Sequence, residues 1–359
     1  MTRLLRTVLL VLCLGAVSSP AAASALGLSV SGNRLVNQAG QPIRLLGVSR
    51  SGSEYACAQG DGFFDGPTSR RSIRAMKKWG INAVRVPLNP DCWLGTDGVK
   101  PRFGGERYRN AIQAFVRRLN RARLYVVIDE HVAGPAGWRA HGIIPMADAD
   151  SSPAFWSSVA ARFAQNHSVV FDLYNEPHHI AWECWLAGCD IPAGGRSSER
   201  HPAYRAAGMK QLVDAVRSTG ATQPLMLGGT AYARDLSGWL AHKPVDPLGQ
   251  LVASEHNYGH RLSPCRVECK AQVEQVAASV PVVVGELGQT DCRHDYIDKW
   301  MRWADGRGIS YFGWAWNAKG GWTCRGGPSL IKNYRGEPTR FGVGFRNHVR
   351  KLRRRHARR

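Results

Sequence analysis

The chain has 359 residues, of which 44% are apolar and 21% are charged, and its formal net charge is +21. This is ample for one large folded domain, and the length alone would permit two. After the first 25 residues no stretch is long and apolar enough to be a transmembrane helix.

The first 25 residues have the three-part layout of a secretory signal peptide. Arg3 and Arg6 precede an apolar stretch at 7–17, and small residues follow at 18–25. Cleavage after Ala23 or Ala25 fits this layout, and the apolar stretch is too short to span a membrane. We therefore expect residues 1–25 to be removed and the mature protein to be secreted.

The rest of the chain alternates between strand-like and helix-like segments. Residues 28–36 predict a small β-hairpin that closes around Gly32. Strands are predicted at 43–48, 83–87, 124–129, 169–174, 225–227, 251–256, 282–285 and 309–314. Helices are predicted between them at 68–79, 106–122, 152–165, 201–218, 234–241, 269–278 and 293–307. Strands and helices alternating in this number predict an α/β fold, a (β/α)₈ TIM barrel over 26–348, with the hairpin at its bottom.

Residues 349–359 form a strongly basic tail without an aromatic residue. We expect this tail to be disordered and solvated. Specific nucleic-acid binding would need interleaved aromatic residues or a known module, and the tail offers neither. Weak attraction to an anionic wall polymer is the alternative for this charge.

Removal of the signal peptide would leave eight cysteines, an even number that favours disulfides in an exported protein. The expected pairs are Cys57–Cys92, Cys184–Cys189, Cys265–Cys269 and Cys292–Cys324, since each lies in one loop or in neighbouring loops. These loops follow strand ends, so they would lie on the C-terminal face of the barrel. A zinc site at Cys265 and Cys269 is the alternative, although no C-x-x-C pair supports it.

Two glutamates stand at the ends of two predicted strands. Asn175, Glu176 and Pro177 follow the apolar run 168–174, and Pro177 cannot continue a sheet ladder. Glu286 ends the similar run 280–285. Parallel barrels keep their chemistry at the C-terminal tips of the strands. Two carboxyl groups at such tips suggest acid/base and nucleophilic work on one bond.

Further polar and aromatic side chains stand in or after other strands. Arg85 interrupts an apolar strand and, if buried, needs an anionic partner. His131, Asn175, His256, Tyr258 and Trp314 complete the candidate substrate-binding set. The alternative is a metal-dependent barrel hydrolase with ligands from Asp129, Glu130, His131, His178 and His179, but no full ligand set falls on adjacent strands.

From about residue 28 to 345 the sequence resembles glycoside hydrolase family 5, the cellulase-like retaining β-glycosidases. The resemblance rests on five motifs in order: Ile-Asn-Ala-Val-Arg-Val-Pro at 81–87, Asn-Glu-Pro at 175–177, His-x-Tyr at 256–258, Gly-Glu at 285–286 and Gly-Trp-Ala-Trp-Asn at 313–317. It implies a (β/α)₈ barrel with Glu176 as acid/base and Glu286 as nucleophile. It also implies supporting roles for Arg85, His131, Asn175, His256, Tyr258 and Trp314, with no metal or organic cofactor.

The function implied is retaining hydrolysis of a β-linked polysaccharide or oligosaccharide, foremost as an endo-β-1,4-glucanase. A β-mannanase, a β-1,3-glucanase and an exo-acting glycosidase stay open, because the long loops at 49–67 and 178–200 could form an open cleft or wall one end. A non-catalytic protein that binds carbohydrate or an anionic wall polymer is the alternative from another class. We expect a monomer without a specific nucleic-acid partner.

Overall fold

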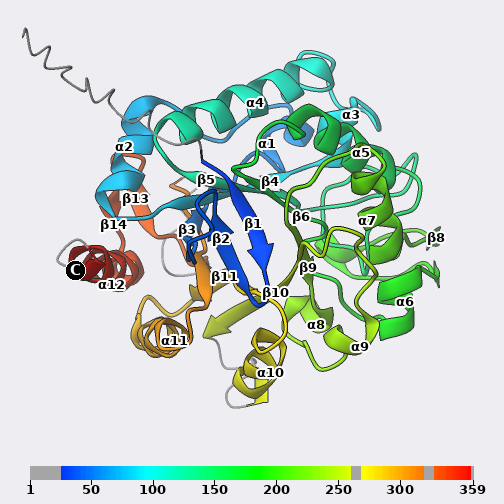
Figure 1. The fold of residues 1–359 in the computed structure, drawn as a ribbon. Helices are drawn as coiled ribbons and strands as arrows, with labels where there is room; N and C mark the ends of the chain where they lie inside the picture. Colours follow the sequence, from blue (N-terminus) through cyan, green and yellow to red (C-terminus); the bar gives the residue numbers. More distant parts are fainter. Residues whose placement is uncertain (1–25, 260–267, 319–326, 357–359) are drawn as a thin grey trace, which may run out of the picture.

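A computed structural model describes residues 26–259, 268–318 and 327–356. Its centre is a closed barrel in which every neighbouring pair of strands is parallel (Figure 1). The barrel strands are β3 (Leu46–Ser49), β4 (Ala83–Leu88), β5 (Tyr125–Glu130), β6 (Val169–Asp172), β9 (Leu225–Gly228), β10 (Leu251–Gly259), β11 (Val282–Gln289) and β12 (Ser310–Gly313). The predicted (β/α)₈ barrel is confirmed, and each of its eight strands overlaps a predicted one.

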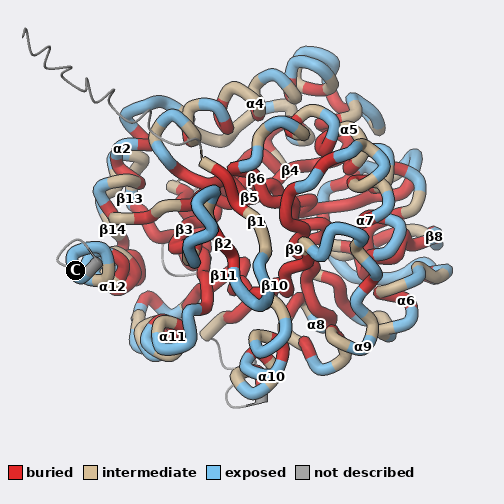
Figure 2. The backbone as a smooth tube through the Cα atoms, viewed as in Figure 1, coloured by how far each residue is buried: buried red, intermediate tan, exposed pale blue. Residues whose placement is uncertain are grey.

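Helices surround this barrel, and the strands at the centre are buried (Figures 1 and 2). The helices are α1 (Ala56–Gln59), α2 (Arg70–Lys78), α3 (Pro90–Leu94), α4 (Glu106–Arg121), α5 (Ser152–Phe163), α6 (Trp182–Ala187), α7 (Met209–Arg217), α8 (Thr230–Ala233), α9 (Trp239–His242), α10 (Glu268–Ala277), α11 (Asp295–Asp305) and α12 (Arg340–His356), with a 3₁₀ turn at Ser197–Glu199. Within the described ranges, no helix has the length and apolar character needed to cross a membrane.

The N-terminal hairpin closes the bottom of the barrel. Its strands β1 (Leu28–Ser31) and β2 (Arg34–Asn37) are antiparallel. Leu28 and Leu35 pack into an apolar cluster with inward-facing strand residues such as Phe312. The backbone nitrogen of Leu28 donates to the carbonyl of His167, at a distance of 2.8 Å. The predicted hairpin is confirmed, and it leaves the opposite end of the barrel for the long loops.

The connection between β6 and β9 contains less helix than predicted. A helix was predicted at 201–218, but helix α7 begins only at Met209. The first part of the predicted helix contains instead the strand β8 (Tyr204–Arg205), which pairs with β7 (Asp190–Ile191). In the next connection, between β9 and β10, helix α9 likewise covers only the end of the predicted segment 234–241. In both cases a glycine comes directly before the helix, Gly208 and Gly238. Glycine is a weak helix former, and the chain before it adopts other structure.

The C-terminal tail is not disordered as predicted, because α12 continues through residues 349–356. Phe341, Phe345 and Val349 recur every four residues and are fully buried. This spacing places them on one face of the helix, which packs against the barrel while the arginines project outward. The folded domain therefore extends beyond the predicted boundary at residue 348. Two antiparallel strands, β13 (Ile331–Asn333) and β14 (Glu337–Pro338), precede the helix.

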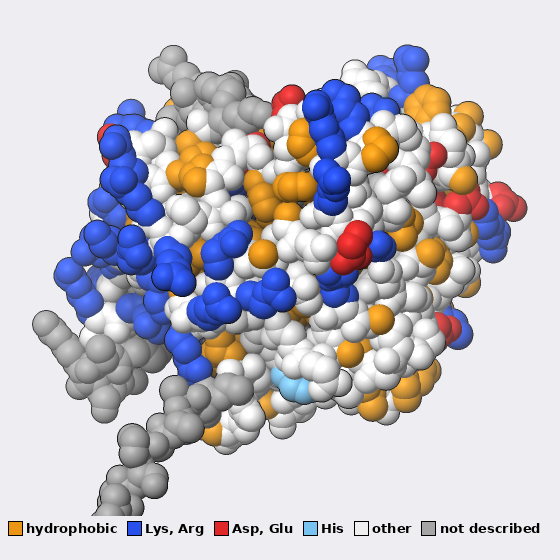
Figure 3. All heavy atoms as spheres, turned by 90° about the horizontal axis from the view of Figure 1, so that it is seen from above, with side chains coloured by type: hydrophobic (Ala, Val, Ile, Leu, Met, Phe, Trp, Pro, Cys, Tyr) orange, Lys and Arg blue, Asp and Glu red, His pale blue; other side chains and the backbone are white. Residues whose placement is uncertain are grey.

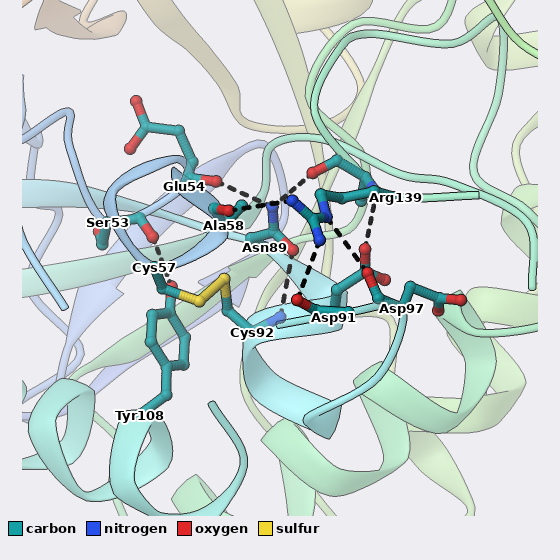
Figure 4. Close-up of a disulfide and its surroundings, with 12 residues drawn as sticks. Ser53, Glu54, Cys57, Ala58, Asn89, Asp91, Cys92, Asp97, Tyr108 and Arg139 are labelled. Carbon is teal, nitrogen blue, oxygen red and sulfur yellow. Dashed lines mark hydrogen bonds between the residues drawn. A yellow bond between two sulfur atoms is a disulfide. The ribbon is translucent and has the colours of Figure 1, made fainter. Parts of the chain in front are cut away.

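Two of the expected disulfides are present, Cys57–Cys92 and Cys184–Cys189. The first joins α1 to α3, and thus the loops after β3 and β4, with a Cα–Cα distance of 6.0 Å (Figure 4). Asn89 adds to this link, because its Nδ2 donates to the carbonyls of Glu54 and Ala140 at 2.9 and 2.7 Å. The pairs Cys265–Cys269 and Cys292–Cys324 each include a cysteine outside the described residues, so they stay predictions. The predicted signal peptide, residues 1–25, also lies outside the described residues.

Candidate active site

The eight candidate site residues come together at the C-terminal end of the barrel. Arg85 lies in β4, His256 and Tyr258 in β10, and Glu286 in β11. The other four residues, His131, Asn175, Glu176 and Trp314, follow the ends of β5, β6 and β12. The hydrogen bonds and ring contacts described below link these side chains into two adjoining groups, one around the two glutamates and one around His131.

A local irregularity in the sheet sets the arrangement of β10 and β11. The register between these strands shifts between Glu255 and His256, and this shift puts His256 opposite Glu286. Gly285 makes room for the imidazole ring, because a Cβ there would come within 2.9 Å of His256 Nε2. Glu255 is not part of the cluster, and its Oε1 instead accepts a hydrogen bond from Asn257 Nδ2 at 2.7 Å. A bulge and one glycine thus bring His256 to the two glutamates.

Arg85 is fully buried and binds three carboxylates. Its guanidinium lies 2.7 Å from Glu286, 2.9 Å from Asp172 and 3.0 Å from Asp129. A fourth contact, of 2.8 Å, runs from its Nη2 to Asn175 Oδ1. The expected anionic partner of Arg85 is therefore a set of three. A pattern search could have found Asp129 and Asp172, since each is an acidic residue directly after an apolar run in its strand.

Burial and neighbouring charges have opposite effects on the pKa values of Arg85 and of the aspartates that it contacts. Burial by itself would lower the pKa of Arg85, but Asp129, Asp172 and Glu286 raise it, so the guanidinium keeps its proton. Burial raises the pKa of Asp129 and of Asp172 to about 7, although the charge of Arg85 opposes this. One cation thus supports a group of carboxyl groups that is only partly ionised near neutral pH.

Glu286 receives hydrogen bonds at both of its oxygens. Arg85 Nη1 donates to Oε1, and the Tyr258 hydroxyl donates to Oε2 in a short hydrogen bond. His256 Nδ1 lies 3.7 Å from the same Oε2. Both oxygens of Glu286 therefore face donors, one of them a guanidinium, and charge-assisted hydrogen bonds of this kind fix the orientation of the side chain that they bind.

Glu176 lies in a different environment. Its side chain is 14% exposed, and its Oε1 lies 2.9 Å from His256 Nδ1. The pKa of Glu176 is raised to about 7, mainly by burial and also by the charge of Glu199, although His131, Arg85 and Arg234 act to lower it. Burial also lowers the pKa of His256 to about 3, so the imidazole is neutral. The two glutamates therefore have different partners: Arg85 and Tyr258 bind Glu286, whereas His256 binds Glu176.

One carboxylate oxygen of Glu176, one of Glu286 and a nitrogen of His256 all lie within 4.8 Å of one another. In the described ranges, these three residues form a group that has the spacing to hold a metal ion. Arg85 and Tyr258 already bind the oxygens of Glu286, so a cation would have to displace them. The separation is close to the roughly 5–5.5 Å between the carboxyl groups of retaining glycosidases.

The alternative metal set of Asp129, Glu130, His131, His178 and His179 is brought together only in part. His131 contacts Asp129, and His178 lies next to His179. Glu130 instead accepts a 2.5 Å hydrogen bond from Ser152 on α5, while His178 also stacks on Tyr232, with the rings at 4.3 Å. Within the described ranges, the five side chains do not form one group with the spacing of metal ligands.

His131 and Trp314 form a stacked pair beside the glutamates. Their ring centroids are 5.2 Å apart and the planes differ by 5°. His131 Nδ1 lies 2.7 Å from Asp129 Oδ2, so the aspartate fixes the orientation of the imidazole. Trp314 was expected to belong to the substrate-binding set, and the structure shows that His131 stacks on one face of its ring.

Sequence reasoning missed Glu54, a buried carboxyl group in the loop after β3 (Figure 4). Ser51 Oγ and the backbone nitrogen of Gly52 donate to its two oxygens, each at 2.6 Å. Burial raises the pKa of Glu54, while the nearby His131 lowers it. Glu54 is therefore an additional acidic group close to His131, and no strand-end motif in the sequence points to it.

We expect Arg85→Met to destabilise the fold by about 3–5 kcal/mol at neutral pH, because three buried carboxyl groups lose the guanidinium that contacts all of them. Asp129 and Asp172 titrate higher in the folded than in the unfolded protein, so protonation on acidification favours folding. The deficit should therefore be smaller at pH 5 than at pH 8. Urea unfolding at both pH values measures it.

Arg162→Met provides the matched control for this experiment. Arg162 forms its ion pair with Glu106 on the surface, where the Glu106 side chain is 57% exposed. Loss of such a pair costs less than about 1 kcal/mol. If the two variants lost equal stability, or if the deficit of Arg85→Met did not change with pH, the buried carboxylates would not depend on Arg85.

Comparison with known proteins agrees with the fold and identifies a family. The model of the cellulase family, glycosyl hydrolase family 5, matches residues 36–320. An endoglucanase of Streptomyces lividans, CelA, is 25% identical over 308 residues, which is 84% of this chain and 58% of the relative. A mannan endo-1,4-β-mannosidase of the same species is 25% identical over 318 residues, covering 86% of this chain and 70% of the relative.

The solved structure of a β-glucanase from Saccharophagus degradans superimposes with a TM-score of 0.68. It covers 92% of this chain and 94% of its own at 18% identity, a similarity that supports the fold alone. The chain spans little more than half of the length of some curated relatives, 58% for CelA and 54% for a manganese-dependent endoglucanase of Phanerodontia chrysosporium.

Proposed function

Because the chain belongs to glycosyl hydrolase family 5, we propose that it is a secreted endo-β-1,4-glucanase that cleaves its substrate with retention of configuration. The observation that carries the proposal is the pairing of Glu176 and Glu286 around His256, with oxygens within 4.8 Å. Such a separation suits direct attack by one carboxylate, since an inverting enzyme needs about 6.5–9.5 Å to admit a water between the groups.

In the first step, a Glu286 oxygen attacks the anomeric carbon as the glycosidic carbon–oxygen bond breaks. Glu176 transfers its proton to the departing oxygen, so the leaving sugar departs as a neutral alcohol. The raised pKa of Glu176, about 7, keeps a useful fraction of this acid protonated near neutral pH. Arg85 and Tyr258 hold Glu286 in position for the attack.

In the second step, Glu176 is a carboxylate and removes a proton from water. The water oxygen attacks the anomeric carbon, and the bond to Glu286 breaks, so the configuration is inverted twice and retained overall. The charge on Glu286 is absent during the covalent stage and returns at the end. Arg85 can stabilise the returning charge without moving, because it is already fixed by Asp129 and Asp172.

Asn175 is suited to bind the sugar hydroxyl next to the reacting carbon. Its Oδ1 accepts from Arg85 Nη2, which leaves Nδ2 to donate to the substrate. Hydrogen bonds to the 2-hydroxyl strengthen in the transition state of glycoside hydrolysis. We expect the stacked pair of His131 and Trp314 to border the same sugar.

A β-1,4-mannanase is the second candidate, favoured by the similarity to the mannan endo-1,4-β-mannosidase of Streptomyces lividans. Mannose differs from glucose in the orientation of its 2-hydroxyl, so the residue that reads this hydroxyl must discriminate between the two sugars. A site built to bond one orientation leaves a buried polar group unpaired with the other.

The deciding experiment assays the purified protein on carboxymethylcellulose, mannan, xyloglucan, laminarin and aryl β-glycosides, with the products sized by chromatography. The proposal expects the highest kcat/KM on the β-1,4-glucan and a rapid fall in its viscosity, with products of many lengths. Release of single sugars from chain ends would contradict endo action. Preference for mannan would instead establish the second candidate. Gel filtration with light scattering tests the expected monomer.

The pH dependence of kcat/KM should report the titration of Glu176. Activity requires the protonated acid, so it should fall as the pH rises through about 7. Replacing Glu199 with Gln removes a negative charge that raises this pKa, and the alkaline limb should move to lower pH. Replacing Arg234 with Met removes a positive charge and should move the limb to higher pH.

The two variants, Glu199→Gln and Arg234→Met, control for each other because the expected pH shifts have opposite signs. Loop damage would reduce activity in both variants without moving the two limbs in opposite directions. Each shift should be below about one pH unit, because the charges act across a partly solvated site. Equal shifts of the same sign would contradict the assignment of the alkaline limb to Glu176.

A further inference from the structure

Two outer helices carry many positive charges and no acidic residue. Of the 17 residues of α12, seven are Arg or Lys, and of the nine residues of α2, five are Arg or Lys. Figure 3 shows Lys and Arg side chains gathered on the side of the molecule that carries α2 and α4, with few Asp or Glu among them. The proposed hydrolysis does not use any of these side chains.

The charges of three elements meet at the C-terminal ends of the helices. The side chain of Arg353 on α12 lies next to Gly80, just beyond α2, where an added Cβ would be 3.0 Å from its Cγ. The pKa of Lys77 on α2 is lowered, mainly by burial and also by the positive charges of Arg353 and Arg123, which therefore lie near it. Arg123 follows the end of α4, so α2, α4 and α12 share one basic region.

We call the exposed side chains of this region the basic rim: Arg70, Arg71, Arg74, Lys78, Arg117, Arg121, Arg350, Lys351, Arg353, Arg354 and Arg355. Across the part of the chain that the structure describes, none of them has an ion pair with a carboxylate. Many surface arginines elsewhere do, such as Arg307 with Glu274. Like charges held together without counter-charges repel one another, and a bound polyanion would relieve this repulsion.

The surface around the rim is hollowed rather than flat. A depression of about 520 Å³ beside the N-terminal hairpin is lined by Arg117, Arg121 and Arg123 together with amide side chains such as Asn120 and Gln165. Another of about 520 Å³ lies on α12 and is lined by Asn347, Arg350, Lys351, Arg354 and Arg355. Neither is lined by Asp or Glu. Such hollows can receive carboxylate groups of a chain that runs across the rim.

We propose that the basic rim is a docking surface for a linear acidic polysaccharide that carries uronate groups. The helices run opposite to the strands, so the C-terminal ends of α2, α4 and α12, where most of the rim lies, are at the bottom of the barrel, away from Glu176 and Glu286. Arg70 and Arg71, at the start of α2, extend the rim along the outer side of the barrel. The proposal rests on the proposed function, because a polysaccharide hydrolase would meet acidic glycans beside its neutral substrate. Docking would hold the enzyme within the glycan matrix while the catalytic face stays free.

The chemistry of the rim favours this partner over nucleic acid or lipid. The aromatic residues of α2, α4 and α12, which are Tyr108, Phe115, Phe341 and Phe345, are buried, so the described helices offer no ring on which a base could stack. Val245 and Leu248, the large apolar residues that are exposed in the described chain, lie outside the rim, so the rim has no side chain to insert into a lipid layer. Arginine forks bind carboxylates in a bidentate manner.

The test measures binding of the full chain carrying Glu176→Gln to beads coated with polygalacturonate, at increasing salt. A rim variant with Arg71, Arg74, Arg350 and Arg354 changed to Glu should bind at least about tenfold more weakly at low salt and show a flatter salt dependence. The matched control changes four exposed residues outside the rim, Arg196, Arg200, Lys243 and Lys299, to Glu, which alters the net charge equally. The control should keep most of the binding.

Equal losses in the two variants would overturn the proposal, since binding would then follow net charge alone. Tighter binding to double-stranded DNA or to anionic lipid vesicles than to polygalacturonate at the same salt would also overturn it. Circular dichroism checks folding, and Gln in place of Glu at the same positions gives a milder pair of variants. Activity of the rim variant on a soluble neutral glucan should stay unchanged, so failure of docking and failure of the proposed hydrolysis give different results.

Discussion

Glu286→Gln is expected to lower kcat on β-glucan by at least about 10⁴-fold, because the covalent intermediate can no longer form. The substitution keeps the size of the side chain and leaves Arg85 and Tyr258 close to one of its atoms. Substrate binding should change much less than turnover. Steady-state kinetics with carboxymethylcellulose and an aryl β-glycoside would measure both.

Rescue by azide identifies the role of Glu286 more directly than the loss of activity. In Glu286→Ala, azide can occupy the space of the carboxylate and attack the anomeric carbon once, which gives a glycosyl azide of inverted configuration. The matched control is Glu255→Gln, which alters another fully buried carboxyl group on β10 outside the cluster. Kinetics of the control should stay within about tenfold of the unsubstituted protein. Formation of an azide of retained configuration would contradict a nucleophilic role for Glu286.

Glu176→Ala should reduce kcat/KM on a natural glucan by about 10²–10⁴-fold, the usual contribution of a general acid. The loss should depend on the leaving group, which separates this residue from a merely structural one. A dinitrophenyl glycoside leaves without protonation, so its first step should be nearly normal while the second step, which needs the base, becomes slow. Stopped-flow measurement should then show a burst of phenol release.

Azide should restore turnover of the dinitrophenyl glycoside by Glu176→Ala, with a glycosyl azide of retained configuration as the product. Here azide attacks the intermediate on Glu286, so two inversions occur. Equal losses on natural and activated substrates, without a burst, would mean that Glu176 is not the acid. His256→Ala is a useful comparison, since His256 contacts Glu176 but carries no transferable proton for the leaving group in the proposed mechanism.

Much of the barrel could be predicted from the sequence because its strands are short, fully buried apolar runs. The segment at β6 is an example, since Val169, Val170 and Phe171 are all buried and Pro177 stops the sheet soon after. The C-terminal ends of parallel strands must meet at one edge. The proximity of Glu176 and Glu286 therefore followed from the order of strands and did not require knowledge of the loops.

Contacts between distant strands could not be predicted in the same way. Arg85 was expected to have an anionic partner, but its three partners stand on β5, β6 and β11. The choice depends on the register of neighbouring strands, and one shifted residue changes which side chains face inward. The bulge before His256 is a case in which local sequence carries no clear signal.

The helix at the C-terminus was missed for a different reason. Its buried residues Phe341, Phe345 and Val349 have helical spacing, but glycines and a dense run of arginines surround them. Charge repulsion favours an extended chain in isolation, and tertiary packing on the barrel outweighs it here. Local composition therefore did not predict that residues 349–356 are helical.

The guanidinium of Arg85 has two roles if the proposed mechanism holds. It would orient Glu286 for bond formation, and it contacts the buried carboxyl groups of Asp129 and Asp172 as well. Activity and thermal stability would then both depend on this one side chain. Substitutions meant to raise the thermal stability of this protein should therefore be placed on its surface, because a stabilising change around Arg85 would risk a loss of turnover.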